Sequence, residues 1–317
     1  MSATKANPHL SIVIPLYNEE NNLEELYEEL VAVLKTMGKS YEIVFIDDGS
    51  RDKSFEIVRK LYNHDKRITG LSLSRNFGHQ VALVAGMEYA SGDVVVMMDA
   101  DFQHPPELIT LLYQKYSEGF DIVNTRRVET EGIRIFKRLT SWLYYKLINF
   151  LSDMKIEASS SDFRLMNRRS VDAFLRFQER NRFNRGLITW MGFKQEIVEY
   201  KAPTRLRGRS KYTLRKMMSL GLDGITSFSS KPLRISFYTG LFIFLAGIAY
   251  AVFAIINHFR GMNIPGWTST ILIILLVGGF QLLSLGIIGE YIARIYSESK
   301  SRPIYFLKDK TGNENEN

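Results

Sequence analysis

The sequence predicts an α/β fold with a mostly parallel sheet, followed by two C-terminal transmembrane helices. Between Leu10 and Thr125, short apolar runs alternate with stretches of helical periodicity, which is the pattern of strand–helix–strand units. Near the C-terminus, residues 235–258 and 267–289 contain no Asp, Glu, Lys or Arg. At about 1.5 Å per helical residue, each stretch is long enough to cross the roughly 30 Å hydrocarbon core of a bilayer.

Five strands are expected in the α/β part, because each is a short apolar run bounded by polar turns. They are Leu10–Leu16, Tyr41–Ile46, Ile68–Leu73, Val94–Met98 and Asp121–Thr125. The run Val94–Met98 is apolar throughout, which suits a strand covered by helices on both faces.

Helices are expected between these strands. One face of the first helix carries Leu23, Leu26, Leu30, Val33 and Leu34. Ser50 is the expected N-cap of the second helix, the third spans His79–Tyr89, and Pro105 and Pro106 open the fourth.

Basic residues surround the two apolar stretches unevenly. Eight lie between positions 205 and 234, four lie between 300 and 310, and Arg260 alone lies between the stretches. By the positive-inside rule, both chain ends are expected to be cytoplasmic. The alternative is a helical hairpin buried inside a soluble protein.

The remaining composition fits a cytoplasmic catalytic part. The N-terminal residues hold no apolar segment of signal-peptide length, and the chain has no cysteine for disulfides or thiolate metal sites. The net charge of +7 comes largely from residues near the apolar stretches, and no nucleic-acid-binding motif is present. Membrane lipid, and not nucleic acid, is therefore the expected partner of the basic residues.

Four regions are expected along the chain. Residues 1–212 form a cytoplasmic domain, which includes a helix at about 132–151 that lies in the membrane interface or, alternatively, faces the domain core. Residues 213–230 form a juxtamembrane amphipathic helix. The two transmembrane helices, at about 235–258 and 267–292, lie within 231–295, and 296–317 is a polar tail that is disordered from Lys308.

Two carboxylates, Asp99 and Asp101, leave the buried strand Val94–Met98 one residue apart. Such a pair suits a hard divalent cation on a nucleotide's phosphates, although a solvated turn gives the same pattern. Polar clusters at 18–22, 47–50, 74–76 and 99–103 all follow strands, so they are expected to line one crevice at the strands' carboxyl ends. No G-x-G-x-x-G or P-loop motif is present, so a metal or basic side chains must neutralise phosphate.

The ordered motifs SIVIPLYNEE, IDDGSRD, LSRNFG and MDADFQHPPE resemble those of the inverting family 2 glycosyltransferases. With two C-terminal spans, the chain is similar to the polyprenyl-phosphate glycosyltransferases, which include the bactoprenol glucosyltransferases of O-antigen (lipopolysaccharide) modification and the aminoarabinose-transferring enzymes. The resemblance implies a Rossmann-like nucleotide-sugar-binding domain. It also implies transfer of a sugar, with glucose expected, from a UDP-sugar to undecaprenyl phosphate on the cytoplasmic leaflet of the bacterial inner membrane, by a homo-oligomer.

The resemblance assigns a donor site to residues at the strand ends. It places the nucleotide sugar against Pro15, Tyr17, Asn18, Glu19, Asp47, Asp48, Arg75 and Asp99. Tyr17 would stack on the base, and Asp47 or Asp48 would accept a hydrogen bond from its imide. Each of these residues also has a structural explanation. Tyr17 could pack at a strand end, the Asp pair could belong to a turn that caps a helix, and Arg75 could form a surface ion pair.

The resemblance also assigns the metal and the reacting centre. Asp101 is the expected ligand of Mg²⁺ or Mn²⁺, with Asp99 and Gln103 as further oxygen ligands, while His104 is structural. Asp162, in SSSDFRLMNRR, is expected near the reacting centre, where it orients the acceptor, stabilises the sugar or acts as a base. The alternative for Asp162 is an acidic cap of a helix at Arg169–Phe177.

Basic residues are expected to bind the lipid phosphate or the diphosphate. They are Arg126, Lys137, Arg138, Arg164, Arg207, Arg209 and Lys211, together with Ser210. The 207–211 group also fits the ordinary positive-inside charge, so a shared role is expected.

Two other functions fit the same motifs less well. A processive polysaccharide synthase would carry a Q-x-x-R-W motif, which is absent, and would need more than two helices for a channel. A non-enzymatic lipid-binding membrane scaffold would not need Asp48, Asp99, Asp101 and Asp162 together.

Overall fold

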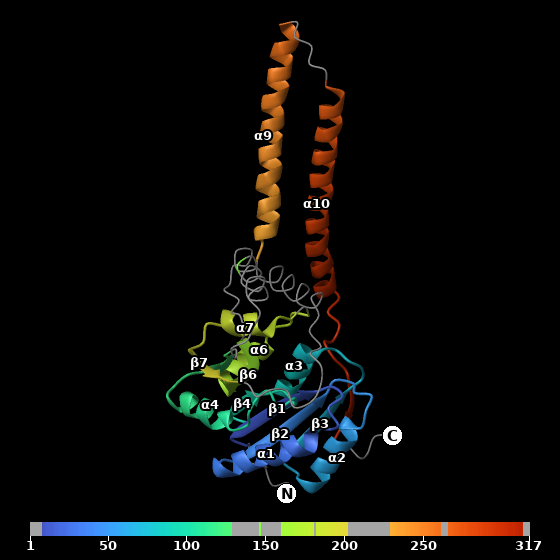
Figure 1. Ribbon diagram of the computed structural model, residues 1–317. Coiled ribbons are helices and arrows are strands. Elements are labelled where there is room, and N and C mark those ends of the chain that lie inside the picture. Colours follow the sequence, from blue (N-terminus) through green and yellow to red (C-terminus); the bar gives the residue numbers. More distant parts are fainter. Residues whose placement is uncertain are drawn as a thin grey trace. The chain divides into compact units, whose positions relative to one another are not determined.

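The computed structural model describes residues 8–128, 146, 160–180, 182–201, 229–260 and 266–312. The chain divides into two compact units, one holding a sheet and one holding two long apolar helices (Figure 1). The expected helices at about 132–151 and 213–230 lie outside the described residues, apart from Lys146, Ser229 and Ser230.

An eight-stranded sheet organises the described part of the first unit, in the order β7-β5-β6-β4-β1-β2-β3-β8. Its strands are β1 (Leu10–Leu16), β2 (Tyr41–Asp47), β3 (Ile68–Leu73), β4 (Val94–Met97), β5 (Ile122–Arg127), β6 (Ser160–Asn167), β7 (Gln195–Tyr200) and β8 (Leu307–Lys310). The pairs β1–β2, β1–β4, β2–β3 and β5–β7 are parallel, whereas β6 is antiparallel to β4 and β5, and β8 to β3. The mostly parallel sheet is therefore confirmed, and the five expected strands are present with ends within two residues; β6, β7 and β8 were not predicted.

Helices cover both faces of this sheet. They are α1 (Leu23–Thr36), α2 (Ser54–His64), α3 (His79–Tyr89), α4 (Leu108–Ser117), α6 (Arg168–Leu175) and α7 (Asn184–Trp190). Apolar side chains of α1, α2 and α4 share one buried cluster with Leu10, Ile12 and Ile14 of β1. On the opposite face α3 lies close to the sheet, because a Cβ on Gly86 would come within 2.4 Å of Val13 and 2.5 Å of Ile46.

Two local predictions about helices are wrong. Ser50 does not cap α2, because that helix begins at Ser54. The Oγ atom of Ser50 accepts from the backbone N–H of Asn18 at 2.9 Å, and the N–H of Ser50 donates to Asp47. On α1, the buried face includes Val31, and Val33 is only partly buried. The difference at Ser50 arises because the turn after β2 packs against the turn after β1, which periodicity does not reveal.

The C-terminal segment returns to the sheet. The prediction that the tail is disordered from Lys308 is wrong for Lys308–Gly312, because these residues form β8 and the turn after it at the sheet edge. Residues 313–317 lie outside the described part of the chain.

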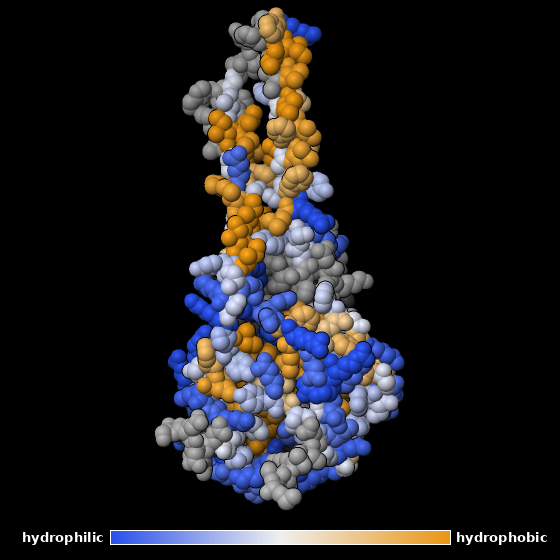
Figure 2. All heavy atoms as spheres, turned by 180° about the vertical axis from the view of Figure 1, so that it is seen from behind, coloured by the Kyte–Doolittle hydropathy of each residue, from blue (hydrophilic) through white to orange (hydrophobic). Residues whose placement is uncertain are grey.

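The second unit holds α9 (Lys231–Phe259) and α10 (Trp267–Ser299). The segments Lys231–Asn257 and Leu276–Ser299 have mean hydropathies of 2.4 and 1.5 in their most apolar windows, and none of those windows is buried. Figure 2 shows apolar side chains covering these helices. Both are long and apolar enough to cross a membrane, and the alternative of a buried soluble hairpin does not fit their exposure.

Candidate active site

The polar segments that follow the parallel strands meet, as expected. The N–H of Asn18, after β1, donates to Ser50 after β2, and Asp48 accepts from Phe77 and Gly78 after β3. Asp99, after β4, lies 3.5 Å from the imidazole of His79. The predicted convergence of these segments at the carboxyl ends of β1 to β4 is therefore confirmed.

Asp47 and Asp48 hold these turns together. Asp47 accepts hydrogen bonds from the N–H of Ser50 at 2.9 Å and the hydroxyl of Ser72 at 3.0 Å. Asp48 accepts from the N–H groups of Phe77 and Gly78 at 2.7 and 2.9 Å. Burial raises the pKa of Asp48, and these two hydrogen bonds only partly offset the rise. Each carboxylate oxygen keeps a second lone pair for a ligand.

Gly49 lets these turns approach one another. Its φ is 71°, and a Cβ there would lie 2.5 Å from the carbonyl carbon of Arg75. Any side chain at this position would be both strained and in collision with backbone, so Gly49 is required by the close approach of two loops.

The remaining expected donor residues lie at the ends of β1 and β3. Pro15 is buried in β1, and Tyr17 is half-buried just after it. Asn18 has a φ of 56°, and its side chain accepts from the N–H of Arg51 at 2.8 Å. Glu19 accepts from the amide of Asn22 at 2.6 Å.

Arg75 is exposed and near the same loops. Its guanidinium lies 4.1 Å from the ring centroid of Phe77, and it donates to the carbonyl of Asn76. No carboxylate among the described residues forms an ion pair with Arg75, so the alternative of a surface ion pair is not supported.

The acidic motif forms a tight turn. Asp101 accepts from the N–H of Gln103 at 3.1 Å, and Phe102 between them has a φ of 59°. The side-chain oxygen of Gln103 accepts from Arg127 at 3.2 Å. The three expected oxygen ligands Asp99, Asp101 and Gln103 thus belong to one short turn after β4.

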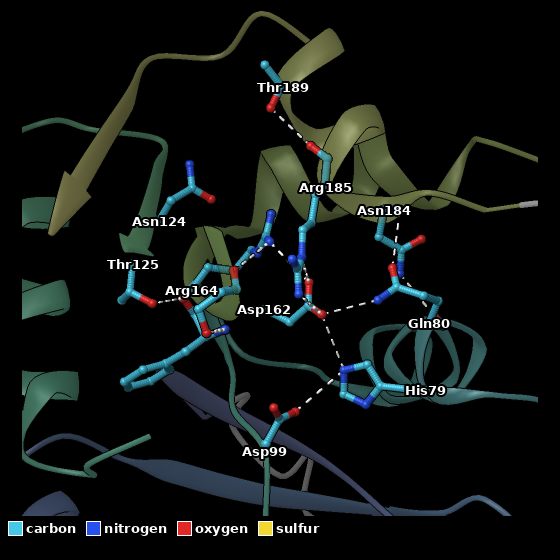
Figure 3. A network of polar contacts seen from close by, with 12 residues as sticks. His79, Gln80, Asp99, Asn124, Thr125, Asp162, Arg164, Asn184, Arg185 and Thr189 are labelled. Atoms are coloured by element: carbon cyan, nitrogen blue, oxygen red, sulfur yellow. Dashed lines mark hydrogen bonds and ion pairs between the residues drawn. The ribbon is translucent and has the colours of Figure 1, made fainter. Parts of the chain in front are cut away.

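Asp162 lies at the centre of a polar network and comes from β6, not from a helix start (Figure 3). Arg185 of α7 donates two hydrogen bonds to its carboxylate, at 2.9 and 3.0 Å. Arg164 donates at 3.3 Å, and Gln80 of α3 donates at 3.2 Å. The alternative that Asp162 caps a helix is wrong, because Asn167 caps α6 by accepting from the N–H of Ser170.

Two histidines connect this network to the acidic turn. The Nε2 atom of His79 lies 3.5 Å from both Asp162 and Asp99. Desolvation opposes its protonation, although the side chain is 41% exposed, and the two carboxylates outweigh this effect and raise the pKa of His79 to about 9. Asp99 and Asp162 are therefore bridged by an imidazolium at neutral pH.

His104 is structural, as predicted. It is buried, and its Nδ1 accepts from the N–H of Asp99 at 2.8 Å while its ring stacks on Phe163. Burial lowers the pKa of His104, so the neutral ring carries its proton on Nε2, next to the hydroxyl of Ser161 at 2.8 Å.

Charge balance fixes Asp162 in its ionised form. The carboxylate is 8% exposed, and burial alone would raise its pKa. Arg185 and His79 reverse that effect and hold the pKa of Asp162 well below 3.8. Burial lowers the pKa of Arg164 to about 10, which still leaves it charged at neutral pH. Asp162 is therefore a poor proton acceptor and a well-held negative charge.

This arrangement predicts a pH-dependent contribution to stability. Because the folded-state pKa of Asp162 is lowered, its contribution is present above about 3.8 and is lost as pH falls through the lower folded value. We expect the difference in unfolding temperature between the wild type and Asp162→Asn to shrink as pH is lowered from 7 to 3. A difference that stays constant over this range would contradict the ionised pair. Asp172→Asn, on the exposed side of α6, is the control.

Arg185 is expected to need its planar, two-pronged geometry. Arg185→Lys keeps the charge but cannot donate two parallel hydrogen bonds to Asp162. We expect this variant to lower kcat by about 10- to 100-fold. Arg168→Lys, at the exposed pair with Asp172, should leave kcat within about twofold, since exposed pairs contribute little. Equal kcat for the Arg185 variant and the wild type would contradict a need for this geometry.

The expected acceptor side is only partly described. Arg126 pairs with Glu199 of β7 at 3.4 Å, whereas its neighbour Arg127 points to Gln103 of the acidic turn. Lys137, Arg138, Arg207, Arg209, Ser210 and Lys211 lie outside the described residues. Arg127 thus contacts the acidic turn through Gln103, and Arg164 contacts Asp162.

Sequence reasoning missed four residues that the structure brings to this site. They are His79, Gln80, Arg127 and Arg185. The polar pair His79–Gln80 at the start of an otherwise apolar helix was a usable signal. Arg185 had no such signal, because neither the strand that carries Asp162 nor the helix that carries Arg185 was predicted.

Comparison with known proteins gives two family matches. Residues 11–175 match glycosyl transferase family 2, and residues 231–295 match the GtrB C-terminal hairpin. An uncharacterized glycosyltransferase of Bacillus subtilis is 44% identical over 306 residues, which cover 96% of this chain and 95% of that protein.

Named relatives span the same length. The bactoprenol glucosyl transferase of Shigella phage SfV is 40% identical over 301 residues, 95% of this chain and 98% of that one. A prophage bactoprenol glucosyl transferase homolog of Escherichia coli is 39% identical over 300 residues, covering 94% and 98%. Among solved structures, glucosyl-3-phosphoglycerate synthase from Mycobacterium tuberculosis aligns with a TM-score of 0.44 and 19% identity over 70% of this chain and 79% of that one, which is too low to carry an argument.

Proposed function

Because this chain belongs to glycosyl transferase family 2 and carries a GtrB-type C-terminal hairpin, we propose that it transfers one sugar, with glucose expected, from a UDP-sugar to undecaprenyl phosphate. One observation carries the proposal. Asp99 and Asp162 meet through His79 at the carboxyl ends of the strands, in a chain that matches bactoprenol glucosyl transferases over nearly its whole length. Transfer of a sugar to a polyprenyl phosphate thus agrees with both the residues of the site and the family of the chain.

The chemistry requires no strong base. A phosphate monoester has a second pKa near 6, so the lipid phosphate oxygen is largely ionised at neutral pH. This oxygen forms a bond to the anomeric carbon while the bond to the diphosphate oxygen breaks, and that electron pair leaves with the nucleoside diphosphate. Attack opposite the leaving group inverts the anomeric configuration.

Asp162 fits a positioning role better than proton transfer. Arg185, Arg164 and Gln80 occupy its oxygens, and its lowered pKa makes it a weak base. Its single negative charge balances the cations around it and fixes the guanidinium groups of Arg185 and Arg164, which would face the acceptor phosphate. Of the three roles open to Asp162, we therefore propose orientation of the acceptor.

We propose that the donor lies on the loops after β1, β2 and β3. Half-buried Tyr17 would stack on the base, and Asp48 would use its second lone pair on the imide. Arg75, exposed beside Phe77, would contact the diphosphate. Asn18, Glu19 and Asp47 would shape this surface, because they fix the turns that carry it, and Pro15 would border it from the end of β1.

The acidic turn fits a hard divalent cation. Asp99, Asp101 and Gln103 offer only oxygen ligands, which suit Mg²⁺ or Mn²⁺, and such ions in nucleotide sites take one or two carboxylates and complete their shell with phosphate oxygens. When bound, the ion would neutralise charge on the departing diphosphate. Arg127 would then share or leave the oxygen of Gln103 and be available to an anionic substrate.

The acceptor is proposed to meet the basic residues. Arg164 is buried beside Asp162, and Arg126 and Arg127 end β5. Lys137, Arg138, Arg207, Arg209, Ser210 and Lys211 complete the proposed group for lipid phosphate or diphosphate. Their charge would also favour anionic lipid at the membrane surface.

The chain is proposed to be a multi-pass protein of the bacterial inner membrane, with its catalytic domain in the cytoplasm and a homo-oligomeric state. Chain connectivity supports the topology, because the polypeptide leaves the first unit before α9 and rejoins the sheet of that unit as β8 after α10. If both helices span the membrane, both ends of the pair are on the side of the catalytic domain. The basic residues beside the helices favour the cytoplasm for that side.

A donor panel tests this proposal. Purified protein in detergent with Mg²⁺ or Mn²⁺ is given UDP-glucose, UDP-N-acetylglucosamine, other UDP-sugars or GDP-mannose, and release of nucleoside diphosphate is followed with and without undecaprenyl phosphate. We expect release from a UDP-sugar that depends on the lipid phosphate. Release from the GDP-sugar alone would overturn the proposed donor class, and release that ignores the lipid would overturn the acceptor.

A further inference from the structure

The segment Tyr305–Gly312, here called the C-terminal brace, is bonded to β3 at both ends of that strand. The N–H of Ser74 donates to the carbonyl of Phe306 at 2.9 Å. At the other end, Gly70 and Thr311 exchange two bonds, from the N–H of Thr311 to the carbonyl of Gly70 at 2.9 Å and from the N–H of Gly70 to the Thr311 hydroxyl at 2.8 Å. β3 is therefore an interior strand only because the brace covers its edge.

Side chains hold the brace to neighbouring elements as well. The contacts are Tyr305 with Glu88 of α3, Asp309 with Arg59 of α2, and the ammonium of Lys310 at 4.8 Å from the ring centroid of Tyr89. Gly70 shows how closely the brace packs, because a Cβ there would lie 2.5 Å from Val58 and 2.8 Å from the methyl group of Thr311. The brace is thus an integral part of the sheet, although α9 and α10 separate it in sequence from every other strand.

The loop that β3 leads into organises the proposed donor site. Ser72, near the end of β3, donates to Asp47, and Phe77 and Gly78 donate to Asp48. The carbonyl of Phe306 binds the first residue of this loop, Ser74. One hydrogen-bonded path therefore runs from the brace through the loop to Asp48.

We propose that the C-terminal brace positions the donor-binding loop Ser74–Gly78, so that affinity for the donor nucleotide depends on a segment that follows the membrane hairpin. This inference rests on the proposed function, because it takes the ligand of these loops to be a uridine nucleotide. It assigns the brace no contact with the donor. Its action is on the position of Arg75 and Asp48.

The physical reason is the cost of an uncovered strand edge. Without the brace, the N–H groups of Gly70 and Ser74 lose their partners, and β3 becomes an edge strand. A loop with fewer fixed contacts opens locally at lower free energy. A ligand that needs the closed loop then binds more weakly, by the fraction of molecules in which the loop is ordered.

Two variants and one control test the proposal in detergent. One variant ends after Ile304, and the other keeps the length but replaces residues 305–312 with a Gly-Ser repeat; the control ends after Gly312. We expect both variants to raise the dissociation constant for UDP and the KM for the donor at least tenfold, with the KM for undecaprenyl phosphate within about threefold. The control should match the wild type. Equal changes in both KM values, or none in either, would overturn the proposal.

A measurement on the wild type guards against variants that do not fold. If the brace favours donor binding, donor binding must favour the docked brace to the same extent. Saturating UDP should therefore slow amide hydrogen exchange at Ser74 and at Thr311, although Thr311 is bonded to Gly70, near the end of β3 that is farther from the donor loop. Slowing at Phe77 and Gly78 without any at Thr311 would overturn the proposal. If the wild type binds no uridine nucleotide, the proposed function fails; if it binds UDP and only the brace effects are absent, this inference alone fails.

Discussion

Asp162→Asn is expected to lower kcat by about 10³-fold. The carboxylate is the shared partner of Arg185, Arg164, Gln80 and His79, and the amide can neither balance their charge nor accept at both positions. Misplacing the reacting groups by about 1 Å can cost roughly 10²-fold, and loss of the charge that balances the surrounding cations adds to this. Initial rates of lipid glycosylation at saturating donor and acceptor measure the effect.

Stability must be measured with this rate. Removing one partner of a buried ion pair can cost about 3–5 kcal/mol, so the unfolding temperature of Asp162→Asn should fall. At temperatures below that transition, the variant should still bind UDP. Asp172→Asn, at an exposed pair on α6, serves as control and should keep its kcat. If Asp162→Asn kept more than about a tenth of the wild-type kcat, the proposed role of Asp162 in orienting the acceptor would be wrong.

Asp101→Asn is expected to lower kcat by at least about 10³-fold and to remove the dependence of UDP binding on divalent metal. The amide oxygen can still accept from the N–H of Gln103, so the turn is expected to survive. The negative charge offered to the cation is lost, and a carboxylate is the stronger ligand for a hard ion. Calorimetric titration of Mn²⁺ in the presence of UDP measures this directly.

Asp93→Asn is the matched control, because Asp93 lies just before the other end of β4 and pairs with His9 on the surface. It should leave metal binding and turnover unchanged. Unaltered metal affinity in Asp101→Asn would contradict the assignment of Asp101 as a ligand, whatever the rate.

The sheet was predictable because its central strands are buried on both faces. Leu10–Leu16 and Val94–Met97 are apolar runs with polar ends, and those ends had to meet because parallel strands carry their carboxyl ends to one edge. The donor turns and the acidic turn followed from the same argument. Their family-specific motifs added residue identities that periodicity does not supply.

The remaining parts depend on pairings between distant segments. β6 carries charged residues inside a central sheet position, where Asp162 and Arg164 neutralise each other, so it does not look like a buried strand. β8, LKDK, is a short charged strand that is stable only because β3 offers an open edge. Arg185 and His79 are single residues whose importance appears only when α7 and α3 bring them to one carboxylate.

The most direct test of the central claim is the mass of the lipid product. Purified full-length protein is incubated with undecaprenyl phosphate, UDP-glucose and Mg²⁺, and the lipid fraction is read by mass spectrometry. The account predicts a single added hexose and no longer series, with the amount of product equal to the UDP released. A growing polymer, or UDP release without any change in the lipid, would contradict it.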